Sequence, residues 1–244
     1  MVSKSKKERK KSNPYEGLRD LKGSRLLKRL NEIDTSLQKA ESASDFACFH
    51  SLLNEIRSDP LLKNEKKEVK RCLGCCCMEI LRLDCELNLS DDESGDFIRM
   101  ILSCLHCLES ASPTVDCSRY LKILNDLQES VFLRMLVNVD IGYEFGIELL
   151  NILFSLWSSE DDQMVDSSTR IVLSLFELYR HIPGEMIDLL LMKLLDKECA
   201  ARVRDVLLSR KSKFSGDIQQ FCMNLLCASS GEESCYESSG SVCV

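Results

Sequence analysis

Two pairs of cysteine residues have a spacing that metal sites and redox sites use. Cys72-Leu-Gly-Cys75 and Cys104-Leu-His-Cys107 are both C-x-x-C pairs, and His106 lies inside the second. Such thiols can bind zinc or, where their pKa is low, carry out redox chemistry. However, 28 residues separate the pairs, more than in common zinc ribbons, and both pairs lie among Leu, Ile and Met instead of on polar turns. We therefore expect core packing, with a zinc-dependent or thiol-based enzyme as the alternative.

The cysteine content as a whole also favours free, buried thiols. The chain has 14 Cys, and its basic N-terminus is followed by no apolar stretch, so we expect no secretory signal and no disulfide framework. Cys72, Cys75, Cys76 and Cys77 fall in a segment of helical periodicity, where cysteine behaves as a small hydrophobic residue. We expect neither a metal nor a cofactor.

Other catalytic signatures are absent from the sequence. His50, His106 and His181 lie in apolar helical segments, which favours core or edge positions, and no H-E-x-x-H, G-x-S-x-G or phosphate-binding glycine motif occurs. The acidic clusters at 91–93 and 160–162 precede or open predicted helices, where carboxylates interact well with the helix dipole. The sequence therefore predicts a protein that is not an enzyme.

One group of basic residues is a candidate binding site. Lys66, Lys67, Lys70 and Arg71 open a predicted helix, and the spacing of the last three places them on one face. This basic patch could bind an acidic peptide or a polyphosphate, or it could be a solubilising surface. Trp157 ends an apolar helix and is expected to pack in the core.

Charge is distributed unevenly along the chain. The 244 residues carry a net charge of −7, but residues 1–12 hold six basic and one acidic side chain, net +5, which leaves −12 for the rest. An acidic body argues against sequence-specific binding of nucleic acid, and no apolar run is long enough to span a membrane. The basic arm predicts nuclear import or an electrostatic tether, with a solvated tail as the alternative. Its candidate import residues are Lys6, Lys7, Arg9, Lys10 and Lys11.

These residues must be positioned by helices, since apolar residues recur every three or four positions along most of the chain. The predicted N-caps are Ser24, Ser44, Ser94, Asp140 and Asp161, and a kink is expected near Ser130. The predicted helices cover 24–40, a segment from Ser44 that includes Ile56, a short continuation from Pro60, 66–87, 94–109, 115–137, 141–157, 162–181, 183–195, 197–210 and 215–228.

Helix pairs define the predicted architecture. They group into units at 44–87, 94–137, 140–181 and 183–228, a period of roughly 40–47 residues, which is typical of two-helix solenoids. We predict an all-α, HEAT-like helical-repeat superhelix of antiparallel helix pairs over 21–228, with an irregular helical bundle as the alternative. Residues 1–20 are a predicted disordered arm, and 229–244 a disordered Ser/Gly/Glu tail.

Several segments resemble one known family in collinear order over about 44–228. KNEKKEVKRCLGCCCMEILRL (63–83) is similar to a helix of the cohesin-associated "precocious dissociation of sisters" family, which has a charged start, paired Cys and Ile-x-Arg-Ile; Val69, Cys76, Ile80 and Arg82 match it. Residues 97–108, SRYLKILNDLQESVFLRMLVNVD (118–140) and HIPGEMIDLLLMKLL (181–195) resemble later helices of that family. The family's Ala-Pro-rich turn is replaced by DCELNLSDDES, which has no proline, and the family's proteins are several times longer.

The resemblance implies a HEAT-repeat scaffold without catalytic activity. It implies a nuclear, chromatin-associated protein that binds the cohesin ring through the kleisin subunit, works with other cohesin regulators, and regulates sister-chromatid cohesion. The family's link to inositol polyphosphate makes the basic patch a candidate site for that ligand. The alternative is a generic, cytoplasmic helical-repeat adaptor unrelated to cohesin.

Overall fold

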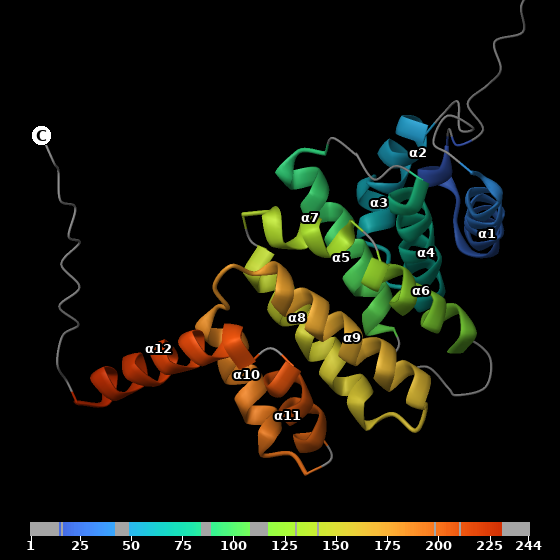
Figure 1. The fold of residues 1–244 in the computed structure, drawn as a ribbon. Coiled ribbons are helices and arrows are strands. Elements are labelled where there is room, and N and C mark those ends of the chain that lie inside the picture. The colour runs from blue at the N-terminus through green and yellow to red at the C-terminus, as the bar shows by residue number, and fades with distance from the viewer. Residues whose placement is uncertain are drawn as a thin grey trace, which may run out of the picture. The chain divides into compact units, whose positions relative to one another are not determined.

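The computed structural model describes residues 15, 17–41, 49–83, 89–107, 117–129, 131–140, 142–197, 199–209 and 211–230, and every regular element in these ranges is a helix (Figure 1). The elements are η1 (Leu18–Asp20), α1 (Gly23–Lys39), α2 (Phe49–Ile56), α3 (Asp59–Leu62), α4 (Lys67–Leu83), α5 (Asp91–His106), α6 (Cys117–Glu129), α7 (Phe132–Asn138), α8 (Gly142–Ser155), η3 (Leu156–Ser158), α9 (Asp162–Leu178), α10 (Gly184–Leu194), α11 (Ala200–Ser209) and α12 (Lys211–Ser230). Within the described ranges, no helix combines the length and apolarity that crossing a membrane requires.

The chain divides into two compact units, Met1–Ile171 and Val172–Val244, and the boundary falls within α9. The basic arm at 1–12 and residues 231–244 of the predicted tail lie outside the described residues, whereas Ser229 and Ser230 belong to α12. Leu18–Asp20, expected to belong to the N-terminal arm, instead form η1 with Leu18 buried. Arg19 Nη2 forms a 2.9 Å ion pair with Glu55 Oε1 of α2, so the ordered part of the first unit begins before residue 21.

Helix α4 is the centre of the first unit and lies between α1 and α5 (Figure 1). Every residue from Cys72 to Leu81 is buried, so this helix is covered on all sides and not along one stripe. A helix in that position needs small side chains where neighbours come close, which the cysteines and Gly74 supply. A Cβ added at Gly74 would lie 2.2 Å from Cys104 Cβ in α5. The two helices therefore pack so closely here that only glycine, which has no Cβ, fits at position 74.

Side-chain contacts give the direction of each helix. Cys104 Sγ donates to Arg71 O over 3.6 Å and Cys77 Sγ lies 3.9 Å from Met100 Sδ, so α5 runs antiparallel to α4. Helices α4 and α1 are parallel, because the start of α4 contacts the middle of α1 and the end of α4 contacts the end of α1. The contacts are Cys72 Sγ to Asn31 Oδ1 (3.4 Å), Cys76 Sγ to Leu30 O (3.8 Å) and Arg82 Nη2 to Leu37 O (2.9 Å).

Contacts between successive pairs recur at a nearly constant offset in sequence. The offset is 41 to 46 residues between α1 and α4. It is 43 between Glu79 and Lys122, and 42 both between Asn125 and Ser167 and between His106 and Glu148. Equivalent helices therefore stack side by side once per repeat, as the predicted period of roughly 40–47 residues requires.

Three details of the predicted helices are corrected. The predicted cap at Ser24 is wrong, because α1 begins at Gly23 and Lys22 holds the N-cap position without a side-chain hydrogen bond. The predicted cap at Ser94 is wrong, because α5 begins three residues earlier and Ser94 is buried inside it. Ser90 is the N-cap: its Oγ accepts from Glu93 N over 3.4 Å, and Glu93 Oε2 accepts from Ser90 N over 2.9 Å. This is the reciprocal capping box of a Ser-x-x-Glu sequence. The segment expected as one kinked helix over 115–137 is two helices, α6 and α7.

The predicted cap at Asp161 is confirmed. Its Oδ1 accepts from the backbone N–H groups of Gln163 (2.9 Å) and Met164 (3.3 Å) at the start of α9.

The second unit has its own small core. Phe176 and Phe214 meet edge to face with ring centroids 5.1 Å apart, and Val203 and Val206 of α11 are fully buried. Asp217 Oδ2 of α12 accepts from Ile182 N over 3.1 Å, which fixes the chain before α10.

Candidate partner-binding pocket on the first unit

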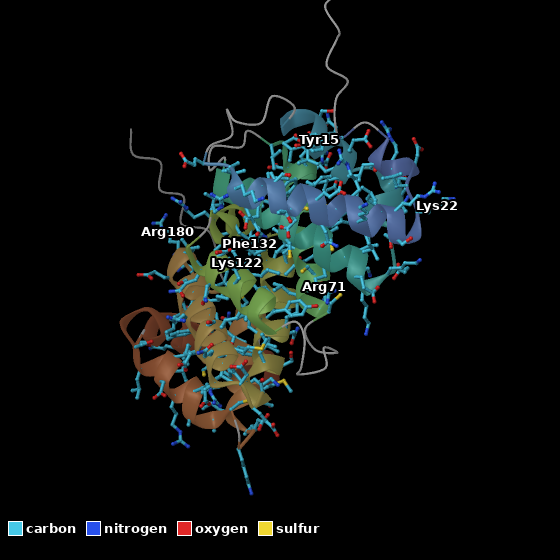
Figure 2. The ribbon with its side chains drawn as sticks, turned by 90° about the vertical axis from the view of Figure 1, so that its right-hand side faces the viewer. Tyr15, Lys22, Arg71, Lys122, Phe132 and Arg180 are labelled. Carbon is cyan, nitrogen blue, oxygen red and sulfur yellow. The ribbon has the colours of Figure 1, made fainter. Side chains whose placement is uncertain are left out.

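The predicted basic patch lies at the start of α4, but its four side chains point in different directions. Lys66 and Lys67 are exposed and Lys70 is half-buried beside α5. Arg71 (labelled in Figure 2) turns toward α6, where it hydrogen-bonds Tyr120. Burial raises the pKa of Tyr120 to about 12, so the phenol stays protonated. The structure therefore brings Lys66, Lys67 and Lys70 to the surface and gives Arg71 a packing role.

Lys70 lines a pocket between α3, α4 and α5. The pocket has a volume of about 90 Å³, and its walls combine four apolar and four polar side chains. The lining residues are Leu61, Leu62, Lys70, Leu73, Asp96, Arg99, Met100 and Ser103.

The acidic side chains on the α5 side of the pocket are neutralised by guanidinium groups. Asp96 Oδ1 lies 3.0 Å from Arg99 Nη1, and its Oδ2 lies 3.8 Å from Arg57 Nη2. Arg57 Nη1 also forms a 2.5 Å ion pair with Glu93 Oε1. The backbone N–H of Ser90, with Arg57, lowers the pKa of Glu93, so this carboxylate stays charged to lower pH than a free glutamate.

Reasoning from the sequence identified Lys70 but missed the other lining residues. Asp96, Arg99 and Ser103 follow one another at three- and four-residue steps, so they form a polar stripe along the predicted helix of 94–109. That stripe is visible in the sequence. Its position opposite Lys70 and Leu61 is not, because it depends on how α3, α4 and α5 cross.

The cysteines of α4 and α5 are core residues, as predicted. Cys72, Cys75, Cys76, Cys77, Cys104 and Cys107 are buried, free thiols. A hydrogen bond with Cys75, together with burial, raises the pKa of the Cys104 thiol, and burial raises the pKa of Cys76 and of Cys77. Burial also raises the pKa of Cys107, although Lys70, Lys67 and Arg71 partly oppose it. Thiols with raised pKa values stay protonated at neutral pH, so these four do not have the low-pKa thiolate that the thiol-enzyme alternative requires of them.

The thiols also point to separate acceptors. Cys107 Sγ donates to Ser103 O over 3.3 Å, whereas Cys72 and Cys104 donate to α1 and α4. Among the residues that the structure describes, no group of three or more His, Cys, Asp or Glu side chains is arranged to hold a metal ion.

The histidines and Trp157, which the sequence analysis considered as possible functional residues, lie at the surface or in the core. His106 Nε2 lies 2.9 Å from Glu148 Oε1 and thereby links α5 to α8 at the surface. His181 is exposed in a bend before α10, 3.6 Å from Asp217, so its predicted helical core or edge position is wrong. The side chain of His50 lies outside the described residues. Trp157 is buried against Phe154, with ring centroids 4.6 Å apart, which confirms a packing role.

A buried carboxylate in α4 escaped sequence reasoning. Glu79 is only 3% exposed, and it forms a 2.7 Å ion pair with Arg82 Nε and a second with Lys122 (labelled in Figure 2). Partial burial lowers the pKa of Lys122, but the hydrogen bond and charge of Glu79 raise it on balance. Because Arg82 also donates to Leu37 O and Ala40 O at the end of α1, this network joins three helices and is structural in nature.

Stacked helix pairs with a small surface pocket define a helical-repeat scaffold. A model of the family described as "Sister chromatid cohesion protein PDS5 protein" matches residues 24–241. The chain belongs to this family, which confirms the resemblance found in the sequence.

A solved structure supports the fold. The chain resembles a chain in the structure described as "Structure of the Pds5-Scc1 complex and implications for cohesin function", with a TM-score of 0.69 and 16% sequence identity. The match covers 84% of this chain and 33% of that one, so this chain spans about a third of its length. The predicted all-α, HEAT-like fold is thereby confirmed. A sequence search of curated proteins gave no match.

Proposed function

We propose that the chain is a non-catalytic scaffold that binds the kleisin subunit of the cohesin ring and regulates sister-chromatid cohesion. The observation that carries this proposal is the family match, which extends over residues 24–241. The similar solved structure is of a Pds5–Scc1 complex, and it supports a cohesin partner for this chain.

The decisive experiment is a binding titration of the full chain with a fluorescently labelled kleisin fragment from the same organism. We expect a Kd of about 1 μM or tighter, corresponding to about −8 kcal/mol. Failure to bind, with helical circular dichroism intact, would remove cohesin from the function. A generic helical-repeat adaptor would then be the better description.

The proposal includes a nuclear, chromatin-associated location. The five basic residues Lys6, Lys7, Arg9, Lys10 and Lys11 are the candidate import signal. Deleting residues 1–12 from a fluorescent fusion should move the protein from the nucleus to the cytoplasm. Unchanged nuclear accumulation after the deletion would exclude the arm as the import signal.

Binding of an inositol polyphosphate is a separate part of the proposal. Lys66 and Lys67 are exposed and adjacent to Lys70, so they present a cluster of cations to an anionic ligand. Inositol hexakisphosphate should raise the melting temperature of the wild-type chain and have a smaller effect on the K66E/K67E variant. Equal shifts in both proteins would exclude this site. Arg71 is left intact because it packs against Tyr120.

A further inference from the structure

The pocket between α3, α4 and α5 has the size of a side-chain site. Small-molecule and cofactor sites occupy roughly 300–1,000 Å³, whereas this pocket measures about 90 Å³. That volume is well below the size of such sites and suits a single short aliphatic side chain. Leu61, Leu73 and Met100 form its buried apolar wall, which favours an aliphatic occupant over a polar one.

The charged side chains at the rim of the pocket favour an acidic residue next to that aliphatic group in the partner. Asp96 is held between Arg99 and Arg57, so its carboxylate is already compensated. Lys70 is paired with Glu65 over 3.3 Å, but the Glu65 side chain is 89% exposed. An exposed ion pair of this kind contributes little, so Lys70 can exchange Glu65 for a carboxylate of a partner at low cost.

The surroundings strengthen this preference for an acidic partner. Lys66 and Lys67 are exposed one helical turn from Lys70, and within the described residues Lys66 forms no ion pair. The chain beyond the N-terminal arm is acidic, so this cationic rim is a local exception. Complementary charge of this kind guides association and selects partners.

We propose that this pocket binds an acidic-aliphatic peptide segment of a protein partner. One Leu, Ile, Val or Met side chain enters between Leu61, Leu73 and Met100, and an Asp or Glu within about one helical turn binds Lys70. The inference deepens the proposed function and rests on it only for the identity of the partner.

The test selects random 12-residue peptides displayed on phage against the immobilised full chain. We expect the enriched peptides to share an aliphatic residue with an Asp or Glu within four positions. Enrichment of basic or aromatic sequences, or no enrichment, would overturn the proposal.

Two variants separate the apolar and the charged part of the pocket. Ser103→Leu places an aliphatic side chain in the pocket and improves helix propensity, whereas Lys70→Glu reverses the rim charge. Each should weaken binding of a selected peptide by about tenfold or more, which corresponds to the loss of one good contact. Lys63→Glu is the matched control, because Lys63 is exposed, pairs with Asp59 and does not line the pocket.

Melting curves of all variants test whether they are folded. If Ser103→Leu and Lys70→Glu bind the peptide as tightly as Lys63→Glu, the pocket is not the site and the inference is wrong. Repeating the measurement with the kleisin fragment distinguishes the two proposals. Kleisin binding that neither variant affects would uphold the proposed function without this pocket. Peptide binding at the pocket without kleisin binding would uphold the pocket and point to another partner.

Discussion

Gly74 of α4 lies directly against Cys104 of α5, and a Cβ at position 74 would be 2.2 Å from Cys104 Cβ and 2.7 Å from its Sγ. Both helices are central to the first unit, so neither can move away without disturbing other contacts. We expect Gly74→Ala to destabilise the first unit by about 1–3 kcal/mol, the usual cost of overpacking a core. Urea unfolding followed by circular dichroism measures this change.

Gly95→Ala provides the matched control. Gly95 is also a buried helical glycine, but its added Cβ would meet only the Arg99 side chain, at 3.7 Å or more. Alanine should therefore leave stability unchanged or raise it by up to about 1 kcal/mol through helix propensity. Equal stability of the two variants would contradict the close crossing of α4 and α5.

Arg82 is predicted to matter more than an ordinary surface arginine. Arg82→Ala removes one of two cations from buried Glu79 and leaves the carbonyls of Leu37 and Ala40 without this donor. We expect a loss of about 2–3 kcal/mol, measured by chemical denaturation. The control is Arg29→Ala, because Arg29 and Glu32 have the same three-residue spacing on the surface of α1. Its cost should stay below about 1 kcal/mol, and a similar loss in both variants would argue against the network.

The capping box predicts a pH dependence for α5. The pKa of Glu93 is lowered in the folded chain, so its contribution to stability is complete above the unfolded-state pKa of about 4.3. That contribution is lost as the pH falls through the lower, folded-state value. The stability difference between wild type and Glu93→Gln should therefore shrink on acidification from pH 7 toward pH 3. A difference that stays constant over this range would refute the assignment.

Thiol labelling tests the burial of the cysteines. Cys222 in α12 is exposed, whereas Cys76, Cys77 and Cys104 are buried with raised pKa values. Iodoacetamide should therefore modify Cys222 in the native protein well before these three, and denaturant should abolish the difference. Peptide mass mapping assigns the sites. Early modification of Cys104 would contradict its buried position in contact with Gly74.

Much of the fold could be predicted because apolar spacing and repeat length are local properties. Residues such as Leu30, Ile33 and Leu37 recur at helical steps and are buried. The predicted cap of α5 is wrong because Ser94 lies just three residues before Phe97, where the apolar run of that helix begins. The Ser90-x-x-Glu93 box one turn earlier was the stronger signal.

The site could be predicted only in part. Spacing from Lys67 places Lys70 and Arg71 on a common face, but neighbouring helical residues point about 100° apart. This rotation gives the two side chains different surroundings, since Lys70 reaches the pocket and Arg71 reaches Tyr120. The apolar wall combines Leu61 with Met100, and only the packing of three helices brings them together.

The complete burial of residues 72–81 of α4 also determines how slowly these residues exchange their backbone hydrogens with solvent. The amides between Cys72 and Leu81 lie in a helix that is covered on all sides, so deuterium can enter only when the first unit opens as a whole. In α12, the side chains around Cys222 and Met223 are exposed, so local fraying suffices for exchange there. Deuterium uptake should therefore be fastest in α12 and slowest in α4. The exchange rate of the buried α4 amides then measures how often the first unit opens as a whole.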